Sequence, residues 1–261
     1  MGNDKVYELD IEARRKKILE ILMQEGKVKV VDLSKLFGIS EVTIRNDLSE
    51  LESAGMLERI HGGAISTHKA YYNMSLHDRM KTNETEKREI AAAVSTLISD
   101  GDTLMVNSGT TTLFAIQELK NVKNMTIVTN SIPIAQEAGY YSNAHVIMLG
   151  GNINPQYQFS YGDDAINQLK KYKADMLILA VDGISSEEGI TTYHHLEAEI
   201  NRQMIARVNK TIVVADYTKI GRISFAHIDS IGSIDILVTN RKASPEEIRK
   251  VEKKGIEVNL V

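Results

Sequence analysis

The feature that most constrains the fold is a series of short apolar segments that alternate with segments of helical periodicity. Residues 176–181 read Met-Leu-Ile-Leu-Ala-Val, without a polar side chain. Strands that are buried on both faces have this composition, because neither face needs polar residues. Further strands are expected at residues 103–107, 125–130, 145–149, 211–216, 234–239 and 256–260. Strands that alternate with helices predict an α/β domain, in which helices cover a Rossmann-like parallel sheet.

The helices of this domain, expected over residues 84–261, lie between the strands, and two of them begin at recognisable caps. Asn83 precedes a helix expected at 86–98, and Ser244-Pro245 precedes the last helix. A short polar side chain can accept a hydrogen bond from the free N–H groups of a first helical turn, and proline is favoured in that turn. The other helices are expected at residues 110–119, 132–138, 163–172 and 196–208.

Residues 1–64 have a different character and predict a separate small domain. Apolar residues recur at helical spacing in a first segment around Ile18 and in a second at residues 31–37, which Gly38 ends. A third helix is expected to begin after Ser40, a residue type that caps helix N-termini. An extended segment and the Gly62-Gly63 pair follow it. The polar residues 65–83, which include the adjacent Tyr71 and Tyr72, are expected to form a partly packed linker.

Three short helices followed by an extended hairpin have the outline of a winged helix-turn-helix, whose last helix enters the major groove of DNA. If Ile44 faces the core, the helical period also turns Leu48 and Leu51 inward and exposes the opposite face. The expected DNA contacts are Ser40, Glu41, Val42, Thr43, Arg45, Asn46 and Ser49 on the third helix, and Arg59 and His61 on the wing. An Asn side chain can pair with adenine, and an Arg side chain with guanine or a phosphate.

A plain three-helix bundle that contacts another protein has the same outline, and charge does not decide between the two. The net charge of −4 argues against a general nucleic-acid coat protein, which would be basic. The third helix carries Glu41, Asp47, Glu50 and Glu52 against Arg45 alone. The basic run at residues 14–17 favours DNA, although such runs are usually solvated helix faces.

The sharpest local feature of the larger domain is Asn-Ser-Gly-Thr-Thr-Thr at residues 107–112, between a predicted strand and a predicted helix. Backbone N–H groups and the helix dipole make a helix N-terminus a ready anion site. Gly109 lets the backbone approach an oxyanion, and the neighbouring hydroxyls can donate hydrogen bonds to it. The expected site residues here are Ser108, Gly109, Thr110, Thr111 and Thr112. Helix capping would explain a single serine, whereas four hydroxyl residues around a glycine favour a phosphate.

Other loops are expected to join this site, because ligands of open α/β sheets bind beyond the carboxyl ends of the strands. Asn130 ends a predicted strand, and Gly150, Gly151 and Asp182 follow predicted strands. Lys219 follows the strand that ends at Asp216 and could also reach an anion. A surface lysine beside a turn is the alternative for Lys219, and the sequence alone favours it.

The N-terminal motifs resemble the winged helix of the DeoR family of bacterial transcription regulators. The resemblance is carried by the Ser-x-x-Thr-Ile-Arg-x-Asp-Leu run at residues 40–48 and by the Arg-x-His-Gly-Gly-Ala run at residues 59–64. It implies that Thr43, Arg45 and the wing contact operator DNA. The family usually has a second arginine at the position of Asn46, so either a different operator sequence or a lower affinity is expected.

The larger domain is similar to the sensor domain of the same family. The matching segments include residues 108–112, Thr129-Asn130-Ser131, Gly150-Gly151, Gly189-Ile190-Thr191, Glu86-Lys87 and Asp216 with Lys219. The resemblance implies a fold like those of ribose-5-phosphate isomerase and glucosamine-6-phosphate deaminase. It also implies a sugar-phosphate effector with its phosphate on residues 108–112, and a repressor of a carbohydrate operon that this effector releases from DNA.

An enzyme that acts on a sugar phosphate and carries a DNA-binding appendage is the alternative function. Proton transfer on a sugar phosphate needs a positioned carboxylate. Asp182-Gly183 resembles the start of the isomerase's Asp-Gly-Ala-Asp motif, but Ile184 and Ser185 replace its last two residues. No catalytic residue, cofactor or metal site is therefore expected, and the absence of cysteine rules out disulfides and cysteine-bound zinc.

The remaining expectations concern compartment and assembly. No apolar run is long enough to span a bilayer, and the polar, charged residues 1–17 do not resemble a secretory signal, so a cytoplasmic protein without a membrane partner is expected. The small domain expected at residues 1–64, which we call the head, reads only a few base pairs of double-stranded DNA. A homo-oligomer, either dimer or tetramer, is therefore expected on paired half-sites.

Overall fold

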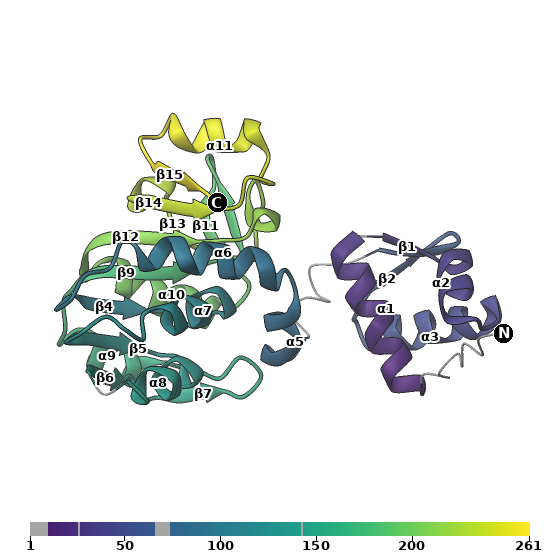
Figure 1. Ribbon diagram of the computed structural model, residues 1–261, viewed down its shortest axis with the longest axis horizontal. Helices are drawn as coiled ribbons and strands as arrows, with labels where there is room; N and C mark the ends of the chain where they lie inside the picture. The colour runs from purple at the N-terminus through teal and green to yellow at the C-terminus, as the bar shows by residue number, and fades with distance from the viewer. Residues whose placement is uncertain (1–9, 26, 66–73, 142) are drawn as a thin grey trace. The chain divides into compact units, whose positions relative to one another are not determined.

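The computed structural model describes residues 10–25, 27–65, 74–141 and 143–261 (Figure 1). The chain divides into two units, Met1–Thr82 and Asn83–Val261. Much of the linker expected at 65–83, including Tyr71 and Tyr72, lies outside the described residues. The described part of that segment contains a short helix, α5 (Leu76–Lys81), which belongs to the first unit.

The first unit contains three helices and a small antiparallel sheet. They are α1 (Ile11–Glu25), α2 (Val30–Phe37), α3 (Glu41–Ser53), β1 (Lys27–Lys29), β2 (Glu58–Ile60) and β3 (Gly63–Ile65). The boundaries of α2 and α3 confirm two sequence predictions. Gly38 ends α2 in the left-handed region with φ 65°, and the Ser40 hydroxyl caps α3 by accepting a hydrogen bond from Thr43 N at 3.1 Å.

The core of this unit is apolar and comes from all three helices and from the sheet. Its buried members are Ile18, Leu22, Val28, Val30, Leu33, Ile44, Leu48, Leu51, Leu57 and Ala64. The strands follow the order β1-β3-β2, and β3 pairs with both neighbours in antiparallel register. A Cβ on Gly63 would lie 2.0 Å from Val28 O, so close pairing of β3 with β1 requires glycine there. This pairing completes a winged helix-turn-helix.

The second unit is built on the predicted seven-stranded parallel sheet, in the order β15-β14-β12-β9-β4-β5-β6. The strands are β4 (Thr103–Val106), β5 (Met125–Thr129), β6 (Ala144–Met148), β9 (Ala174–Ala180), β12 (Val208–Val214), β14 (Ile236–Thr239) and β15 (Glu257–Leu260). Each neighbouring pair is parallel. From β4 the chain moves outward to β5 and β6, and it then returns to β9 on the other side of β4. The direction of winding therefore reverses between β4 and β9.

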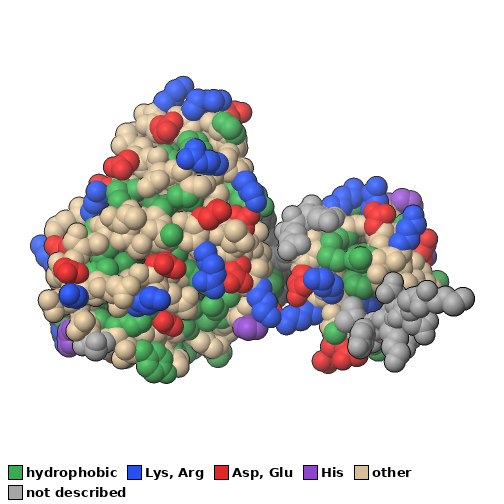
Figure 2. Space-filling view, in the orientation of Figure 1, with side chains coloured by type: hydrophobic (Ala, Val, Ile, Leu, Met, Phe, Trp, Pro, Cys, Tyr) green, Lys and Arg blue, Asp and Glu red, His purple; other side chains and the backbone are tan. Residues whose placement is uncertain are grey.

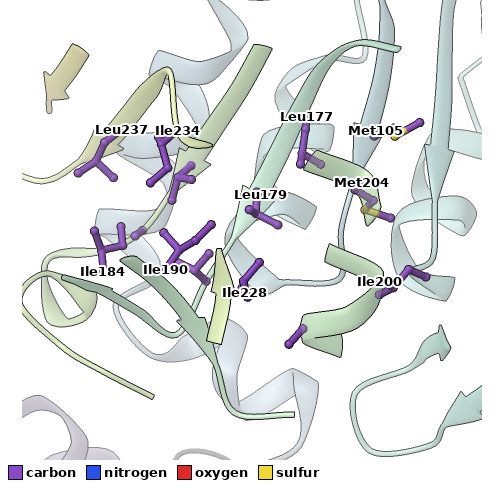
Figure 3. Packing of buried hydrophobic residues seen from close by; sticks show 14 of the residues in the cluster. Met105, Leu177, Leu179, Ile184, Ile190, Ile200, Met204, Ile228, Ile234 and Leu237 are labelled. Carbon is purple, nitrogen blue, oxygen red and sulfur yellow. The ribbon is translucent and has the colours of Figure 1, made fainter. Parts of the chain in front are cut away.

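Helices cover both faces of this sheet (Figure 1). They are α6 (Glu84–Ser95), α7 (Thr110–Glu118), α8 (Ile132–Gly139), α9 (Asp163–Leu169), α10 (His195–Ile205) and α11 (Pro245–Glu252). α7 packs between α6 and α8 in one layer, and α9 packs against α10 in the other. Figure 3 shows the main core, in which Leu177 and Leu179 of β9 lie near Met204 of α10.

Several short elements were not predicted. The hairpin of β7 (Asn152–Asn154) and β8 (Phe159–Tyr161) follows β6. A second antiparallel sheet contains β10 (Gly183–Ser185), β11 (Gly189–Thr192) and β13 (Ala226–Asp229). Strands of three or four residues are too short to show an alternating or continuous apolar pattern, which also explains why β1 was missed.

The cap predicted at Asn83 is wrong in its chemistry. Asn83 does precede α6, but its backbone is left-handed with φ 51°, and its side chain makes no capping hydrogen bond. Its amide instead donates to the Asp216 carboxylate at 3.4 Å. Among the described residues, no helix is both long and apolar enough to cross a membrane.

Candidate functional sites

The exposed face of α3 is the one that the helical period predicts. Ile44, Leu48 and Leu51 are buried, whereas Val42 is 63% exposed. Arg45 and Asn46 are also exposed, and Thr43 and Ser49 are half-buried at the sides of the same face. Arg59 and His61 are exposed on the wing formed by β2 and β3. A surface helix with polar side chains beside a wing has the geometry that reads a DNA groove.

The basic run at residues 14–17 is paired with acidic residues of the same unit, so it supports DNA binding less than its charge suggests. Asp47 of α3 is 2% exposed. It accepts hydrogen bonds from Arg14 Nε at 2.7 Å and from Arg15 Nε at 3.0 Å. Lys16 and Lys17 are also paired, with Asp78 at 3.2 Å and with Glu20 at 2.9 Å. The arginines therefore join α1 to α3 inside the head, and we call Arg14, Arg15 and Asp47 the Asp47 cluster.

The acidic residues of α3 are less adverse to DNA binding than their number suggests. Asp47 faces the core, and Glu52 accepts from Arg59 N at 2.9 Å. Glu41 pairs with Arg45 at 2.5 Å, one helical turn away on the exposed face. Three of the four carboxylates are therefore compensated by basic or N–H groups of the same unit. On the face of the second unit visible in Figure 2, acidic and basic side chains lie interspersed.

Residues 108–112, which we call the cradle, lie where the winding of the sheet reverses. They connect β4 to α7, and ligands of open α/β sheets bind beyond the strand ends at such a reversal. α7 begins at Thr110 after the N-cap Gly109, which has no side chain to cap the first N–H groups. In the described part of the chain, the hydroxyls of Thr110 and Thr111 make no hydrogen bond. N–H groups and two hydroxyls at this end of α7 are therefore available to an anion.

The other two hydroxyls of the cradle are engaged by the protein. The Thr112 hydroxyl lies 2.9 Å from both Asn107 O and Gly109 O, and it donates within the turn. The Ser108 hydroxyl donates to Tyr157 O at 3.4 Å. The expectation that three or four hydroxyls can donate to a ligand is therefore too high for this conformation.

Gly109 is needed for contact with the neighbouring strand. Its φ of 179° is ordinary extended backbone, but a Cβ would lie 2.5 Å from the Ala180 Cβ of β9. Asn107 fixes the same contact, because its side chain accepts from Ala180 N at 2.8 Å and donates to Ala180 O at 2.9 Å. The two carboxamides Asn107 and Asn201 also meet at 3.3 Å, so the turn is connected to α10.

The β7–β8 hairpin lies against the ends of β5 and β6, and its loop meets the cradle at the bond from Ser108 to Tyr157 O. Asn130 is fully buried and donates from its side chain to Ser160 O at 3.2 Å, while its Oδ1 has no partner. A Cβ on Gly151 would lie 2.6 Å from Tyr161 O, and Gly150 N donates to Gln168. Packing of the hairpin and of α9 therefore accounts for the two glycines without a ligand.

Asp182, the carboxylate considered for catalysis, shapes the loop that follows β11. Its Oδ2 accepts from Thr192 Oγ1 at 3.0 Å and from Tyr193 N at 2.9 Å. These bonds connect the end of β9 to the start of α10 and occupy one carboxylate oxygen. Among the described residues, no three acidic or histidine side chains gather as metal ligands.

Lys219 is buried, and the surface alternative is therefore wrong. It is 5% exposed, and Lys87 of α6 is 1% exposed. Both ammonium groups act on Asp216, which is 3% exposed. Burial raises the pKa of the Asp216 carboxyl, but Lys219, Lys87 and the hydrogen bonds from Thr218 outweigh it and hold that pKa below the usual range. We call these three residues the Asp216 cluster, which contains two cations and one anion.

Comparison with known families assigns both units. Residues 14–70 match the DeoR-like helix-turn-helix domain, and residues 82–241 match the DeoR C-terminal sensor domain. The chain is 35% identical over 250 residues to the putative aga operon transcriptional repressor of Escherichia coli O157:H7, covering 95% of this chain and 93% of that protein. It is 30% identical over 227 residues to the glycerol-3-phosphate regulon repressor of Escherichia coli K12, covering 87% and 90%.

Solved structures give a weaker likeness. Ribose 5-phosphate isomerase A from Methanocaldococcus jannaschii aligns with a TM-score of 0.38 and 18% identity, covering 52% of this chain and 54% of that one. Because this score is below 0.5, the fold assignment depends on the sheet topology and on the two family matches. By these matches the chain belongs to the DeoR family of DNA-binding transcription regulators.

Proposed function

We propose that this regulator represses genes of carbohydrate metabolism and that a phosphorylated sugar releases it from its operator. The observation that carries the proposal is the start of α7, where uncapped N–H groups and the Thr110 and Thr111 hydroxyls lie at the reversal point of the sheet. A phosphate group matches this arrangement, because it accepts several hydrogen bonds and is attracted by the helix dipole.

The Asp216 cluster supports an anionic effector. It lies at the same edge of the sheet, because Asp216 follows β12 as Ser108 follows β4. Two buried ammonium groups at this edge of the sheet would attract an anion that binds nearby. In this proposal Lys219 attracts the effector, Ser108–Thr112 hold its phosphate, and Asn130 and Asp182 contribute nearby polar atoms. Gly150 and Gly151 act through packing of the hairpin and of α9.

The relatives support the class of genes and of effector. One is named as a repressor of the aga operon and another as the repressor of a glycerol-3-phosphate regulon. A phosphorylated small molecule is therefore consistent both with the second name and with the α7 geometry. Ser108, Thr110 and Thr111 are at most 7% exposed. In this proposal the loop between β7 and β8, which accepts the Ser108 hydroxyl at Tyr157 O, moves to admit the effector.

On the DNA side, we propose that the contacts are made by the exposed face of α3 and by the wing. The residues are Ser40, Glu41, Val42, Thr43, Arg45, Asn46, Ser49, Arg59 and His61. One such head covers a few base pairs, so two or more copies would bind paired half-sites. The regulator would act in the cytoplasm, where bacterial DNA is found.

A catalytic role is disfavoured by Asp182. A general base needs a carboxylate directed at its substrate, whereas Oδ2 of Asp182 is held by the loop at Thr192 and Tyr193. We therefore propose that the sensor binds its sugar phosphate without converting it. Turnover of sugar phosphates by the full chain, abolished in Asp182→Asn, would support the enzyme alternative instead.

The test is binding of the full chain to the DNA upstream of its own gene, at fixed salt, with hexose 6-phosphates, pentose 5-phosphates and glycerol 3-phosphate. One of these phosphates is expected to release the DNA. Thr110→Val is expected to raise the releasing concentration by at least about tenfold, since it removes one hydrogen bond to a charged group. Thr126→Val is the matched control, because Thr126 lies near the start of β5, away from the strand ends that border the cradle. It should leave release unchanged. DNA binding that no phosphate weakens would refute the effector proposal.

The DNA contacts are tested in the same assay. Arg45→Ala is expected to weaken operator binding by about 1–3 kcal/mol if it reads a base, and to lower the salt slope by about one if it contacts a phosphate. An affinity and a salt slope that both stay at the wild-type values would exclude Arg45 from the interface.

A further inference from the structure

We propose that Asp216 and Asn83 are positioning residues that couple effector binding to the junction between sensor and head. Effector binding beside Asp216 would weaken the hydrogen bond by which this carboxylate holds the first turn of α6, where the sensor begins. This inference depends on the proposed function, because it assigns a consequence to an anion bound at that edge of the sheet.

The backbone changes conformation at the junction between the two units. The boundary between the two units falls between Thr82 and Asn83. Thr82 is extended with φ −73° and ψ 123°, and Asn83 is left-handed with φ 51° and ψ 41°. The chain therefore turns sharply at this point. A left-handed residue other than glycine is maintained only where its surroundings favour it, and asparagine tolerates this region better than most residues.

The surroundings of Asn83 converge on Asp216. The Asn83 amide donates to Asp216 Oδ1 at 3.4 Å, and Lys87, one helical turn later, is a close cation to the same carboxylate. Lys87 N also donates to Asn83 O at 3.0 Å. The first turn of α6 is therefore tied to the end of β12 by the hydrogen bond from Asn83, and the charge of Lys87, four residues later, attracts the same carboxylate.

Asp216 is also shared with groups of its own loop. Thr218 donates to Asp216 Oδ1 from its backbone N at 3.0 Å and from its hydroxyl. Asn83 thus competes with two other donors for one oxygen, and its own bond is long. A small displacement of the carboxylate is enough to remove this bond while the bonds to Thr218 persist.

An anion provides a reason for such a displacement. Lys87 and Lys219 both attract Asp216 in the free protein, and a phosphate drawn to either ammonium group would compete with the carboxylate for it. Repulsion between the two anions would move Asp216 away from the incoming phosphate. The hydrogen bond at the left-handed residue would then be weakened, and the first turn of α6 would lose one of its anchors.

The experiment compares Asn83→Gly with wild type in the full chain. Glycine adopts the left-handed conformation without strain, so this change removes the Asp216 bond and keeps the turn. Asn124→Gly is the matched control, because Asn124 is also left-handed, with φ 57°, and lies in the loop before β5. Calorimetry with the releasing sugar phosphate measures effector binding, and fluorescence anisotropy with upstream DNA measures release.

The expected result for Asn83→Gly is an effector Kd within about threefold of wild type, with a change of at least about fivefold in the releasing concentration, the lower end of typical coupling between sites. Asn124→Gly should match wild type in both measurements. Wild-type release by Asn83→Gly, with effector binding intact, would overturn the inference and leave the proposed function standing. Failure of any sugar phosphate to bind the wild-type protein would instead refute the proposed function.

A second measurement tests the coupling without an effector. Hydrogen exchange of peptides that cover residues 76–90 is expected to be faster in Asn83→Gly than in wild type and Asn124→Gly, because the first turn of α6 loses an anchor. Equal exchange in all three proteins would show that the Asp216 bond does not hold the junction.

Discussion

Each unit of this regulator buries one aspartate against two basic residues, but the two clusters are built differently. In the head, Asp47 accepts from the Nε atoms of Arg14 and Arg15, both on α1. In the sensor, Lys87 of α6 and Lys219 of the loop after β12 both act electrostatically on Asp216, which also accepts hydrogen bonds from Asn83 and Thr218. One cluster joins two helices of a single core, and the other joins a strand end to the junction of the units.

The difference between arginine and lysine gives the two clusters different properties. A guanidinium group stays charged at any physiological pH and presents its donors in a rigid plane. It therefore fixes the angle between α1 and α3 and orients the exposed face of α3. An ammonium group is a compact charge on a flexible stem, and its pKa shifts readily when it is buried. The Asp216 cluster can therefore adjust to a change in local charge that the Asp47 cluster would resist.

The largest effect is expected from Asp47→Asn. The carboxamide keeps the shape but leaves two guanidinium groups without an anion, which is expected to cost about 3 kcal/mol. Hydrogen exchange in α1 and α3 should then become about 100-fold faster, and DNA binding should weaken. Glu50→Gln, an exposed position on the same helix, is the control and should change stability by less than about 0.5 kcal/mol. Wild-type exchange in the Asp47 variant would show that the cluster does not hold the helices together.

A smaller effect is expected from the equivalent change in the sensor, Asp216→Asn. The cost should be about 1–2 kcal/mol, because the carboxamide oxygen can still accept the hydrogen bonds from Thr218 and Asn83. Exchange of peptides from β12 and β14 measures it. A loss of stability greater than that of Asp47→Asn would contradict the comparison between the two clusters.

The Asp216 effect also has a predictable dependence on pH. The pKa of the Asp216 carboxyl is lowered in the folded state, because Lys219 and Lys87 outweigh the effect of burial. Its contribution to stability is therefore complete above the unfolded-state pKa of about 3.9 and is lost as the pH falls through the lower folded value. The Tm difference between wild type and Asp216→Asn should be constant between about pH 5 and 7 and shrink below about pH 4. A difference that grows on acidification would have the wrong sign.

The smallest effect is expected where a similar ion pair lies at the surface. Lys242 pairs with Glu86 at 2.5 Å, but its side chain is 64% exposed. Water and salt screen such a pair, so Lys242→Met should change the Tm by no more than about 1 °C. A fall of several degrees in low salt, absent in high salt, would show that exposed pairs also stabilise this protein.

The features best predicted from the sequence are those for which a single segment carries its own signal. Continuous apolar runs predicted the strands of the parallel sheet, and the period of Ile44, Leu48 and Leu51 predicted the exposed face of α3. The sequence did not predict contacts in which a side chain pairs with a distant segment, as Asp47 does with Arg14. A signal was present, because Asp47 lies three residues after Ile44 and four before Leu51 and so shares their buried face. An acid at such a position predicts a basic partner, although the period does not say which one.

In the sensor, the burial of Lys219 and the position of the β7–β8 hairpin could not be predicted for the same reason. A lysine next to a turn is usually exposed, and only the packing of α6 against the sheet shows that Lys219 meets Asp216 in the interior. The hairpin strands have three residues each, and their position over Asn130 depends on Ser160 and Gly151, which carry no local strand signal. Both features are contacts between distant segments, which no local periodicity can encode.

The closed cradle has a consequence for the time course of a response. Ser108 donates to Tyr157 O, and the neighbouring hydroxyl residues have almost no exposed surface, so under the proposed function the effector binds only after the loop between β7 and β8 has moved. The rate of association would then reach a ceiling at high ligand concentration, set by the opening rate of the protein. A regulator built in this way would report the sustained level of a metabolite and average out fluctuations that are shorter than the opening time of its own hairpin.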